Sequence, residues 1–168
     1  MHLMLLRHAK SDWDAGSRSD HERPLNPRGI RSAERMGEVI QDLGLVPDLV
    51  VSSTATRARS TAELARLAGG WGSRLVLEDR LYGASVQDTL QVAADHGGGC
   101  DRLMLVGHEP TWSMTVRRLT GAVAAIKTAT LADVELNANT WGDVTTASGS
   151  LVTLLQPRQF LRTDGDDQ

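Results

Sequence analysis

The feature that most constrains the fold of this chain is an alternation of short apolar runs with longer stretches of helical periodicity. The apolar runs are bounded by glycine, proline or charged residues, and they read as buried strands. They occupy residues 2–6, 48–52, 75–77 and 103–106. The stretches near residues 30–43, 58–67, 86–93 and 112–119 repeat apolar residues at helical spacing. This alternation predicts an α/β fold with a mostly parallel sheet and helices on both faces.

The pattern changes beyond Gly121. Residues 131–136 and 151–155 look like strands joined by a polar loop around Trp141, and we expect them to form an antiparallel edge. A chain of 168 residues fits one domain, since domains usually run to about 100–200 residues. We therefore expect a single three-layer α/β/α domain over residues 1–162, with an antiparallel edge strand and then a frayed acidic tail at residues 163–168.

Composition excludes several classes of protein. The apolar run at residues 3–6 is far shorter than the roughly 20 apolar residues of a membrane span, and too short for the core of a signal peptide. The single cysteine, Cys100, cannot form an internal disulfide, so we expect a reducing, cytoplasmic location. The net charge of −3 argues against non-specific nucleic-acid binding. We expect neither a membrane nor a nucleic acid as a partner.

The cations are unevenly divided between arginine and lysine. Of the 18 basic residues only Lys10 and Lys127 are lysines, and the other 16 are arginines. Codon bias in a GC-rich genome would produce this excess. Phosphate chemistry would also favour it, because arginine binds phosphate with two parallel hydrogen bonds. Composition alone leaves both explanations open.

Two histidines and two arginines follow the ends of predicted strands. Arg7 and His8 close the first strand, Arg57 follows the second, and His108 follows the fourth. In a parallel sheet these ends share one edge, where ligands bind in α/β folds. A lone histidine or arginine there is usually structural or solvated, but a cluster of four potential cations is costly without an anion. Arginine geometry and the helix start near Arg57 make phosphate the natural anion.

The motifs around these residues resemble the histidine phosphatase superfamily. They read LLRHAKS at residues 5–11, SSTATRARSTA at residues 52–62 and VGHEP at residues 106–110, and the stretch RPLNPRG at residues 23–29 is also typical. The short chain and the segment AKSDW at residues 9–13 resemble the SixA-type branch of small phosphohistidine phosphatases. The resemblance runs from residue 3 to about residue 160 and implies a phosphoglycerate mutase-like fold.

The resemblance also implies a mechanism that needs no metal or other cofactor. His8 would attack phosphorus and form a phosphohistidine intermediate. Arg7 and Arg57 would hold the phosphoryl oxygens, and His108, protonated when phosphate is bound, would add a further donor. The sequence contains no His-Glu-x-x-His pattern for a metal.

Other residues have a functional and a structural interpretation of similar weight. Ser11 would contact the phosphate or cap its loop, and Arg23, like Lys10, would line the entrance or lie on the surface. Many relatives carry a carboxylate that protonates an alcohol leaving group, yet residues 81–86 contain none. Asp88 is the nearest one downstream, although its Ser-x-x-Asp pattern favours a helix cap. Glu109 would be a proton donor or a supporting residue.

The missing acid favours phosphohistidine in a protein as the substrate. A leaving imidazole can be protonated on its ring, whereas an alkoxide needs much more help from an acid. The alternative is a phosphomonoesterase acting on a small phosphorylated metabolite, such as a sugar phosphate. A non-catalytic phosphate-binding module is a third hypothesis, which the presence of His8 disfavours.

Overall fold

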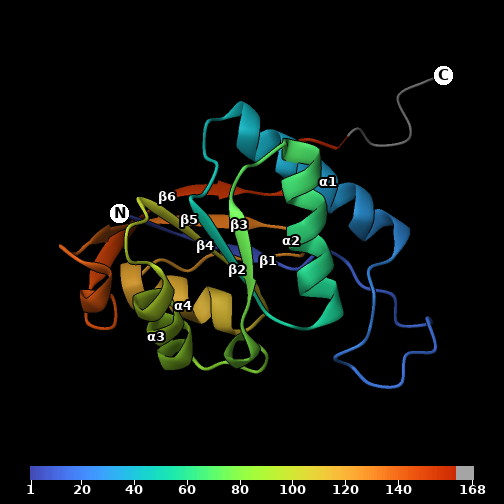
Figure 1. The fold of residues 1–168 in the computed structure, drawn as a ribbon, viewed down its shortest axis with the longest axis horizontal. Helices are drawn as coiled ribbons and strands as arrows, with labels where there is room; N and C mark the ends of the chain where they lie inside the picture. Colours follow the sequence, from blue (N-terminus) through green and yellow to red (C-terminus); the bar gives the residue numbers. More distant parts are fainter. Residues whose placement is uncertain (162–168) are drawn as a thin grey trace.

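The computed structural model describes residues 1–161, so the predicted tail at 163–168 lies outside the described residues. Six strands form one sheet in the order β3-β2-β4-β1-β5-β6 (Figure 1). The strands are β1 (His2–Arg7), β2 (Leu49–Ser52), β3 (Arg74–Leu77), β4 (Arg102–Gly107), β5 (Leu131–Asn137) and β6 (Ser148–Leu155). The helices are α1 (Pro27–Asp42), α2 (Thr56–Gly69), α3 (Val86–His96) and α4 (Thr111–Thr120). Three short 3₁₀ segments, η1 (Asp79–Leu81), η2 (Trp141–Asp143) and η3 (Pro157–Gln159), complete these elements.

The strand directions confirm the expected α/β fold and its antiparallel edge. β1, β2, β3 and β4 pair in parallel, while β5 runs antiparallel to both β1 and β6. Because only β5 is reversed, β6 points the same way as β1. The start of β5 and the end of β6 therefore lie at the same edge as the carboxyl ends of β1, β2 and β4: Leu6 pairs with Leu131, and Leu131 with Leu155.

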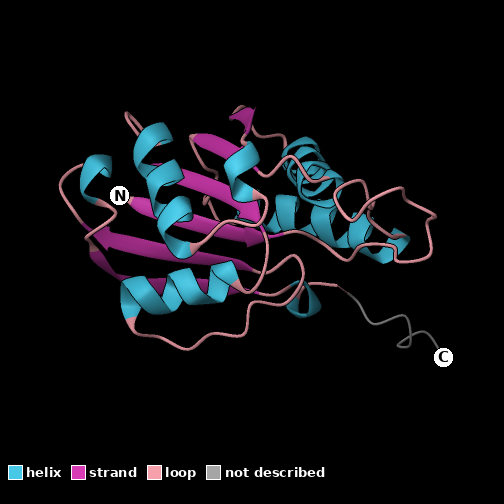
Figure 2. Ribbon diagram, turned by 90° about the horizontal axis from the view of Figure 1, so that it is seen from below, coloured by secondary structure: helices cyan, strands magenta, loops and turns pink. Residues whose placement is uncertain are grey.

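The sheet is buried between two layers of helices, as the apolar runs predict. Alternate side chains of β1 enter opposite cores, since strand side chains point alternately to the two faces. Leu3 and Leu5 pack in the core with α3 and α4, and Met4 and Leu6 pack in the core with α1 and α2. Figure 1 shows these helix pairs on opposite sides of the sheet, and Figure 2 shows helices covering the face of the sheet that is turned toward the viewer.

Helix α1 begins at Pro27, three residues before the helical periodicity that the sequence shows near residue 30. The side chain of Asn26 caps the helix by accepting a hydrogen bond of 2.8 Å from Gly29 N. Proline at the first helical position lacks only an N–H that would have no partner in the helix. The cap holds the end of the loop formed by residues 10–26, which reaches over the carboxyl edge of the sheet.

None of the helices within residues 1–161 combines the length and the apolar character needed to cross a lipid bilayer.

Candidate active site

Continued strand pairing brings the candidate residues to one edge of the sheet. His8 N donates to Gly107 O (2.9 Å), and Ser53 N donates to Val106 O (2.9 Å), so the β1–β4–β2 ladder extends one residue past β1 and β2. His108 follows β4 directly. A Cβ at Gly107 would lie 2.7 Å from the Trp112 ring, so glycine is needed for α4 to pack this close to the strand end.

The surroundings of His8 define its tautomer. His8 Nδ1 lies 2.7 Å from Ala9 O, and a carbonyl only accepts, so Nδ1 carries a proton and donates it. Burial above all, with the positive charges of Arg57 and Arg7 contributing, lowers the pKa of His8 to about 4. The ring is therefore neutral at pH 7, and Nε2 keeps its lone pair. Arg57 Nε donates to Nε2 at 3.4 Å.

His108 completes a buried pair of histidines. The two ring centroids are 5.2 Å apart, and His108 Nε2 lies 2.9 Å from Ser53 Oγ. Burial, followed by electrostatic repulsion from His8 and Arg57, lowers the pKa of His108 to about 3. The ring is thus neutral while no anion is bound. A phosphate beside it would raise this pKa, so the protonated form expected from the sequence depends on the bound anion.

Arg57 and Arg7 reach the same site from α2 and β1. Arg57 is 6 % exposed, and its Nη2 donates to Asp20 Oδ2 at 3.0 Å. Arg7 Nη1 donates to Ile126 O at 3.0 Å. Thr61 connects α2 to the residues that follow β1. Its hydroxyl donates a hydrogen bond to Arg57 O and accepts one from Ala9 N. The structure therefore brings together the four residues predicted from the strand ends.

The loop formed by residues 10–26 contributes two further side chains that the sequence proposed. Arg23 is 8 % exposed and Ser11 is 6 % exposed. Arg23 Nη1 donates to Ser11 Oγ, and its guanidinium carbon lies 3.6 Å from the centroid of a Trp13 ring. Stacking on an aromatic face stabilises a guanidinium group. The charge of Arg23 also contributes to lowering the pKa of His8, so this arginine belongs to the cationic cluster.

Asp20 joins the site although the sequence did not indicate it. Its carboxylate accepts hydrogen bonds from Arg57, from Arg23 at 2.8 Å and from the Tyr82 hydroxyl at 3.0 Å. The hydrogen bonds from Arg23, and then those from Tyr82 and Arg57, lower the pKa of Asp20 to about 2. Asp20 and Tyr82 are 62 residues apart, and no local pattern predicts such a contact. This ionised carboxylate neutralises the cations that would hold a phosphate.

The two carboxylates proposed as proton donors differ in their position relative to this cluster. Asp88 is exposed on α3 and forms the predicted capping box with Ser85, which accepts a hydrogen bond of 3.1 Å from Asp88 N. Glu109 adjoins His108, and its Oε2 accepts from Ser113 Oγ at 2.7 Å. Asp88 does not reach the cluster, whereas Glu109 lies beside it. Within residues 1–161, no three His, Cys, Asp or Glu side chains are grouped to hold a metal ion.

Comparisons with known proteins agree with this geometry. Residues 3–89 match the model of the histidine phosphatase superfamily (branch 1). The chain belongs to the histidine phosphatase superfamily. As a member of this superfamily it is a phosphatase, with a phosphoglycerate mutase-like fold.

Individual relatives cover most of the chain. An uncharacterized protein of Mycobacterium tuberculosis (strain H37Rv) is 35% identical over 164 residues, which span 91% of this chain and 100% of the relative. A Nakamurella multipartitia protein assigned as the phosphohistidine phosphatase SixA is 28% identical, with a TM-score of 0.82 over 93% of this chain and 95% of that one. The protein histidine phosphatase SixA in complex with tungstate shares the fold, with 20% identity and a TM-score of 0.82 over 96% of this chain and 100% of that one.

The depressed pKa values of the two histidines predict a loss of stability in acid. In the unfolded chain a histidine binds a proton near pH 6.5, whereas folded His8 stays neutral down to about pH 4. Between these values the unfolded state binds more protons, so the free energy of unfolding decreases as the pH falls. Each histidine contributes a slope of up to about 1.4 kcal/mol per pH unit. Urea unfolding of the wild type and of His108→Gln should show a shallower slope in the variant; equal slopes would contradict the neutral pair.

The position of Asp20 predicts that its charge competes with phosphate. Asp20→Asn keeps a side chain of similar shape but removes the negative charge that faces Arg57 and Arg23. We expect inorganic phosphate to inhibit this variant about tenfold more strongly, since a fixed anion no longer repels it. Asp14→Asn, in the exposed part of the same loop, is the matched control and should leave the inhibition constant unchanged. Weaker phosphate inhibition of Asp20→Asn would mean that Asp20 mainly positions the arginines.

Proposed function

We propose that this phosphatase forms a covalent phosphoenzyme on His8 and removes phosphate from phosphohistidine in a protein, without a metal ion. The tautomer of His8 carries the proposal, because a neutral ring with an unprotonated Nε2 beside Arg57 is able to attack phosphorus. We place this activity in one domain over residues 1–162. The single cysteine, Cys100, supports a reducing, cytoplasmic location.

In the first step, Nε2 of His8 attacks phosphorus and the bond to the leaving nitrogen breaks. The His8 ring becomes positively charged as the P–N bond forms, and the hydrogen bond from Nδ1 to Ala9 O stabilises that charge. Arg57 and Arg7 are placed to hold the phosphoryl oxygens, with Arg23 nearby. Asp20 must give up its bonds to Arg57 when the phosphoryl group binds there.

In the second step, water attacks the phosphorus of the phosphoenzyme. The bond to Nε2 breaks, its electron pair returns to the ring, and the proton of the water passes to phosphate or solvent. Inorganic phosphate leaves and His8 regains its neutral form. A bound phosphoryl group raises the pKa of His108, so His108 takes up a proton from solvent and donates a hydrogen bond to a phosphoryl oxygen in both steps.

The proton inventory of the site supports phosphohistidine over an ester. Asp20 has a pKa of about 2 and cannot supply a proton at neutral pH. A phosphohistidine ring takes up a proton from solvent on its second nitrogen, so its imidazole leaves as a neutral base without an acid from the enzyme. An alkoxide lacks that route.

A small phosphorylated metabolite is the second candidate substrate, and Glu109 is the observation that favours it. Glu109 and His108 line a hollow whose walls include Leu81, Val86 and Met114. A leaving alcohol bound in this hollow would lie beside the Glu109 carboxyl group. Protonation by Glu109 would then replace the protonation by solvent that phosphohistidine uses.

Substitution of His8 tests the covalent step. We expect His8→Ala to lose turnover by about 10³-fold or more, because the variant lacks the nitrogen that forms the bond to phosphorus. Phosphate binding should be largely kept, since the arginines remain. Arg57→Ala should weaken phosphate binding and lower the rate by about 10²–10³-fold. His96→Ala on α3 is the control, and phosphate release with p-nitrophenyl phosphate is the measurement. Substantial turnover by His8→Ala would show that the nucleophile is wrongly assigned.

A substrate panel tests the preference for phosphohistidine. We expect kcat/KM for a phosphohistidine peptide to exceed that for sugar phosphates by at least about tenfold, because only the ester needs an acid. Glu109→Gln should leave turnover of the phosphohistidine peptide unchanged. Equal or faster turnover of the esters, with a loss in Glu109→Gln, would instead support the metabolite phosphatase.

A further inference from the structure

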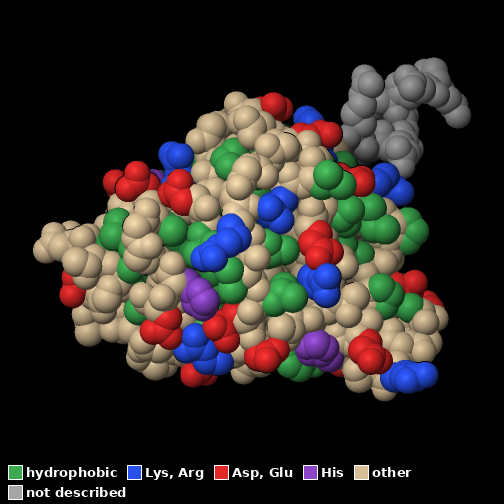
Figure 3. Space-filling view, in the orientation of Figure 1, with side chains coloured by type: hydrophobic (Ala, Val, Ile, Leu, Met, Phe, Trp, Pro, Cys, Tyr) green, Lys and Arg blue, Asp and Glu red, His purple; other side chains and the backbone are tan. Residues whose placement is uncertain are grey.

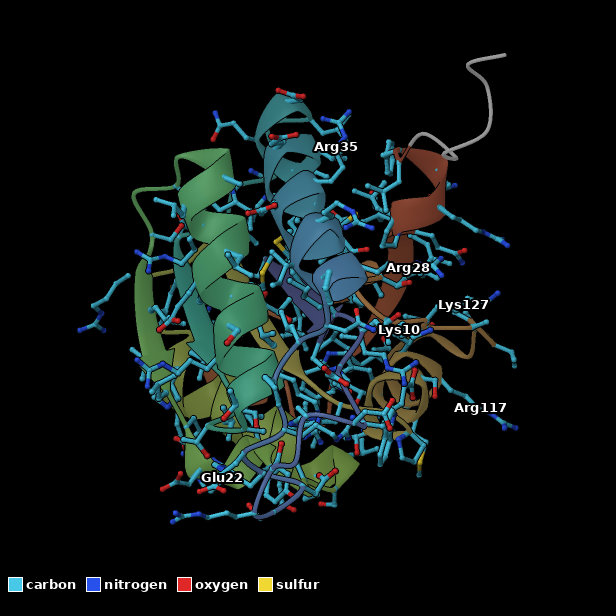
Figure 4. The ribbon with its side chains drawn as sticks, turned by 90° about the vertical axis from the view of Figure 1, so that its right-hand side faces the viewer. Lys10, Glu22, Arg28, Arg35, Arg117 and Lys127 are labelled. Carbon is cyan, nitrogen blue, oxygen red and sulfur yellow. The ribbon has the colours of Figure 1, made fainter. Side chains whose placement is uncertain are left out.

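Both lysines of the chain meet in one pocket outside the candidate phosphate site. The two lysines, Lys10 and Lys127, line it together with Arg28 and Arg158. Its remaining walls include Ser32 and Gln156, and none of the described residues that line it is a carboxylate. Figure 4 shows Lys10, Arg28 and Lys127 together on one side of the molecule. The four cations come from four separate segments of the chain.

The reversed strand β5 explains why these segments meet at this edge. Lys127 lies just before β5 begins, and Arg158 follows the end of β6. Lys10 follows β1, and Arg28 lies in the first turn of α1. All four therefore lie at the edge where His8 and His108 follow their strands. The phosphate site occupies the β2–β4–β1 part of this edge, and the pocket occupies the β5–β6 part.

The backbone connects the pocket directly to the candidate active site. Lys10 is two residues after His8, and its carbonyl accepts a hydrogen bond of 3.0 Å from Asn26 N, next to the start of α1. Ile126, whose carbonyl binds the Arg7 guanidinium, immediately precedes Lys127. The segments that position His8 and Arg7 are thus the same ones that form two walls of the pocket.

The charge of the pocket is not balanced by the described part of the chain. The side chains of Lys10, Arg28, Lys127 and Arg158 are exposed, and within residues 1–161 none of them pairs with a carboxylate. Elsewhere exposed arginines do pair, as Arg59 does with Glu63 at 2.8 Å. The face drawn in Figure 3 mixes acidic and basic side chains, without a large patch of one sign. Four cations around one hollow repel one another, so an anion there would be favourable.

We propose that this pocket binds an acidic segment of the protein substrate while the phosphohistidine of that substrate occupies the phosphate site. The proposal rests on the proposed function and adds the substrate feature that the enzyme recognises. Small metabolites are usually enclosed by their sites, whereas all four cationic side chains here are exposed. Exposed charges of one sign steer and orient a protein partner that carries the opposite charge.

The test uses two synthetic phosphohistidine peptides of equal length. In one peptide the residues flanking the phosphohistidine are glutamates, and in the other they are glutamines. We expect the wild-type enzyme to show an approximately tenfold lower KM for the acidic peptide, and this advantage should shrink at high salt. The double variant Lys127→Glu/Arg158→Glu should lose the advantage while keeping kcat on both peptides and activity on p-nitrophenyl phosphate.

A charge reversal on the opposite edge of the sheet is the matched control. Arg74→Glu on exposed β3 changes the net charge of the protein in the same direction, and we expect it to keep most of the preference for the acidic peptide. Equal KM values for the two peptides with the wild-type enzyme would overturn the proposal. A preference that survives in Lys127→Glu/Arg158→Glu would overturn it as well.

Two further measurements separate other anions from a substrate segment. The chain itself carries aspartates at residues 164, 166 and 167, so the reversal is repeated with all three changed to asparagine. With the three aspartates changed, Lys127→Glu/Arg158→Glu must still remove the preference for the acidic peptide. If it no longer does so, the pocket binds the chain's own tail. If only metabolites with two anionic groups respond to the reversal, the pocket serves a small molecule and the proposal is wrong.

Direct binding keeps this test independent of the proposed reaction. Fluorescence anisotropy with the unphosphorylated acidic peptide reports on the pocket alone. Weaker binding by Lys127→Glu/Arg158→Glu, with no turnover of either phosphohistidine peptide, would contradict the proposed function but leave the pocket as an acidic-segment site. Turnover of both phosphohistidine peptides, with equal binding of the unphosphorylated peptide by wild type and variant, would support the proposed function and contradict the proposed pocket.

Discussion

The parallel register of β1, β4 and β2 is the constraint on which the site depends. The residues that follow these three strands, His8, His108 and Ser53, lie together only because the strands end at the same level. A shift of one residue in this pairing would turn each side chain to the opposite face. Burial of the strands from both sides opposes such a shift, because it would move His2 or Arg7, which flank the apolar run of β1, into a fully buried position.

The same burial explains an electrostatic contrast within the site. Arginines surround two histidines that are themselves neutral, because removal from water penalises a charged imidazole among existing positive charges. Arginine keeps its charge under such conditions, whereas histidine does not. The cluster therefore holds fixed positive charge for an oxyanion and, in the same space, an uncharged nitrogen with a lone pair.

Much of this arrangement could be predicted from the sequence, and the exceptions have a common cause. Once the strands are placed on the apolar runs, the positions of Arg7, His8 and His108 follow, because these residues adjoin the runs. The position of Arg57 follows from the second strand and the helix after it. Asp20 could not be found in this way. Its contacts depend on how the loop formed by residues 10–26 closes over α2 and η1, and loop closure leaves no periodic signal in the sequence. Helix α1 begins three residues before its apolar periodicity, because Asn26 provides the cap.

The reversed direction of β5 has a consequence for how proteins with this sheet can diversify. It extends the carboxyl edge by two strand ends whose side chains take no part in the β1–β4–β2 register. The segment before β5 holds Arg7 and His8 through its backbone groups, so the side chains of Lys127 and Arg158 can change without disturbing the geometry around His8. The phosphate site and the cationic pocket lie on separate halves of one edge. Selection can therefore alter the side chains that bind a partner while it preserves those that bind phosphate.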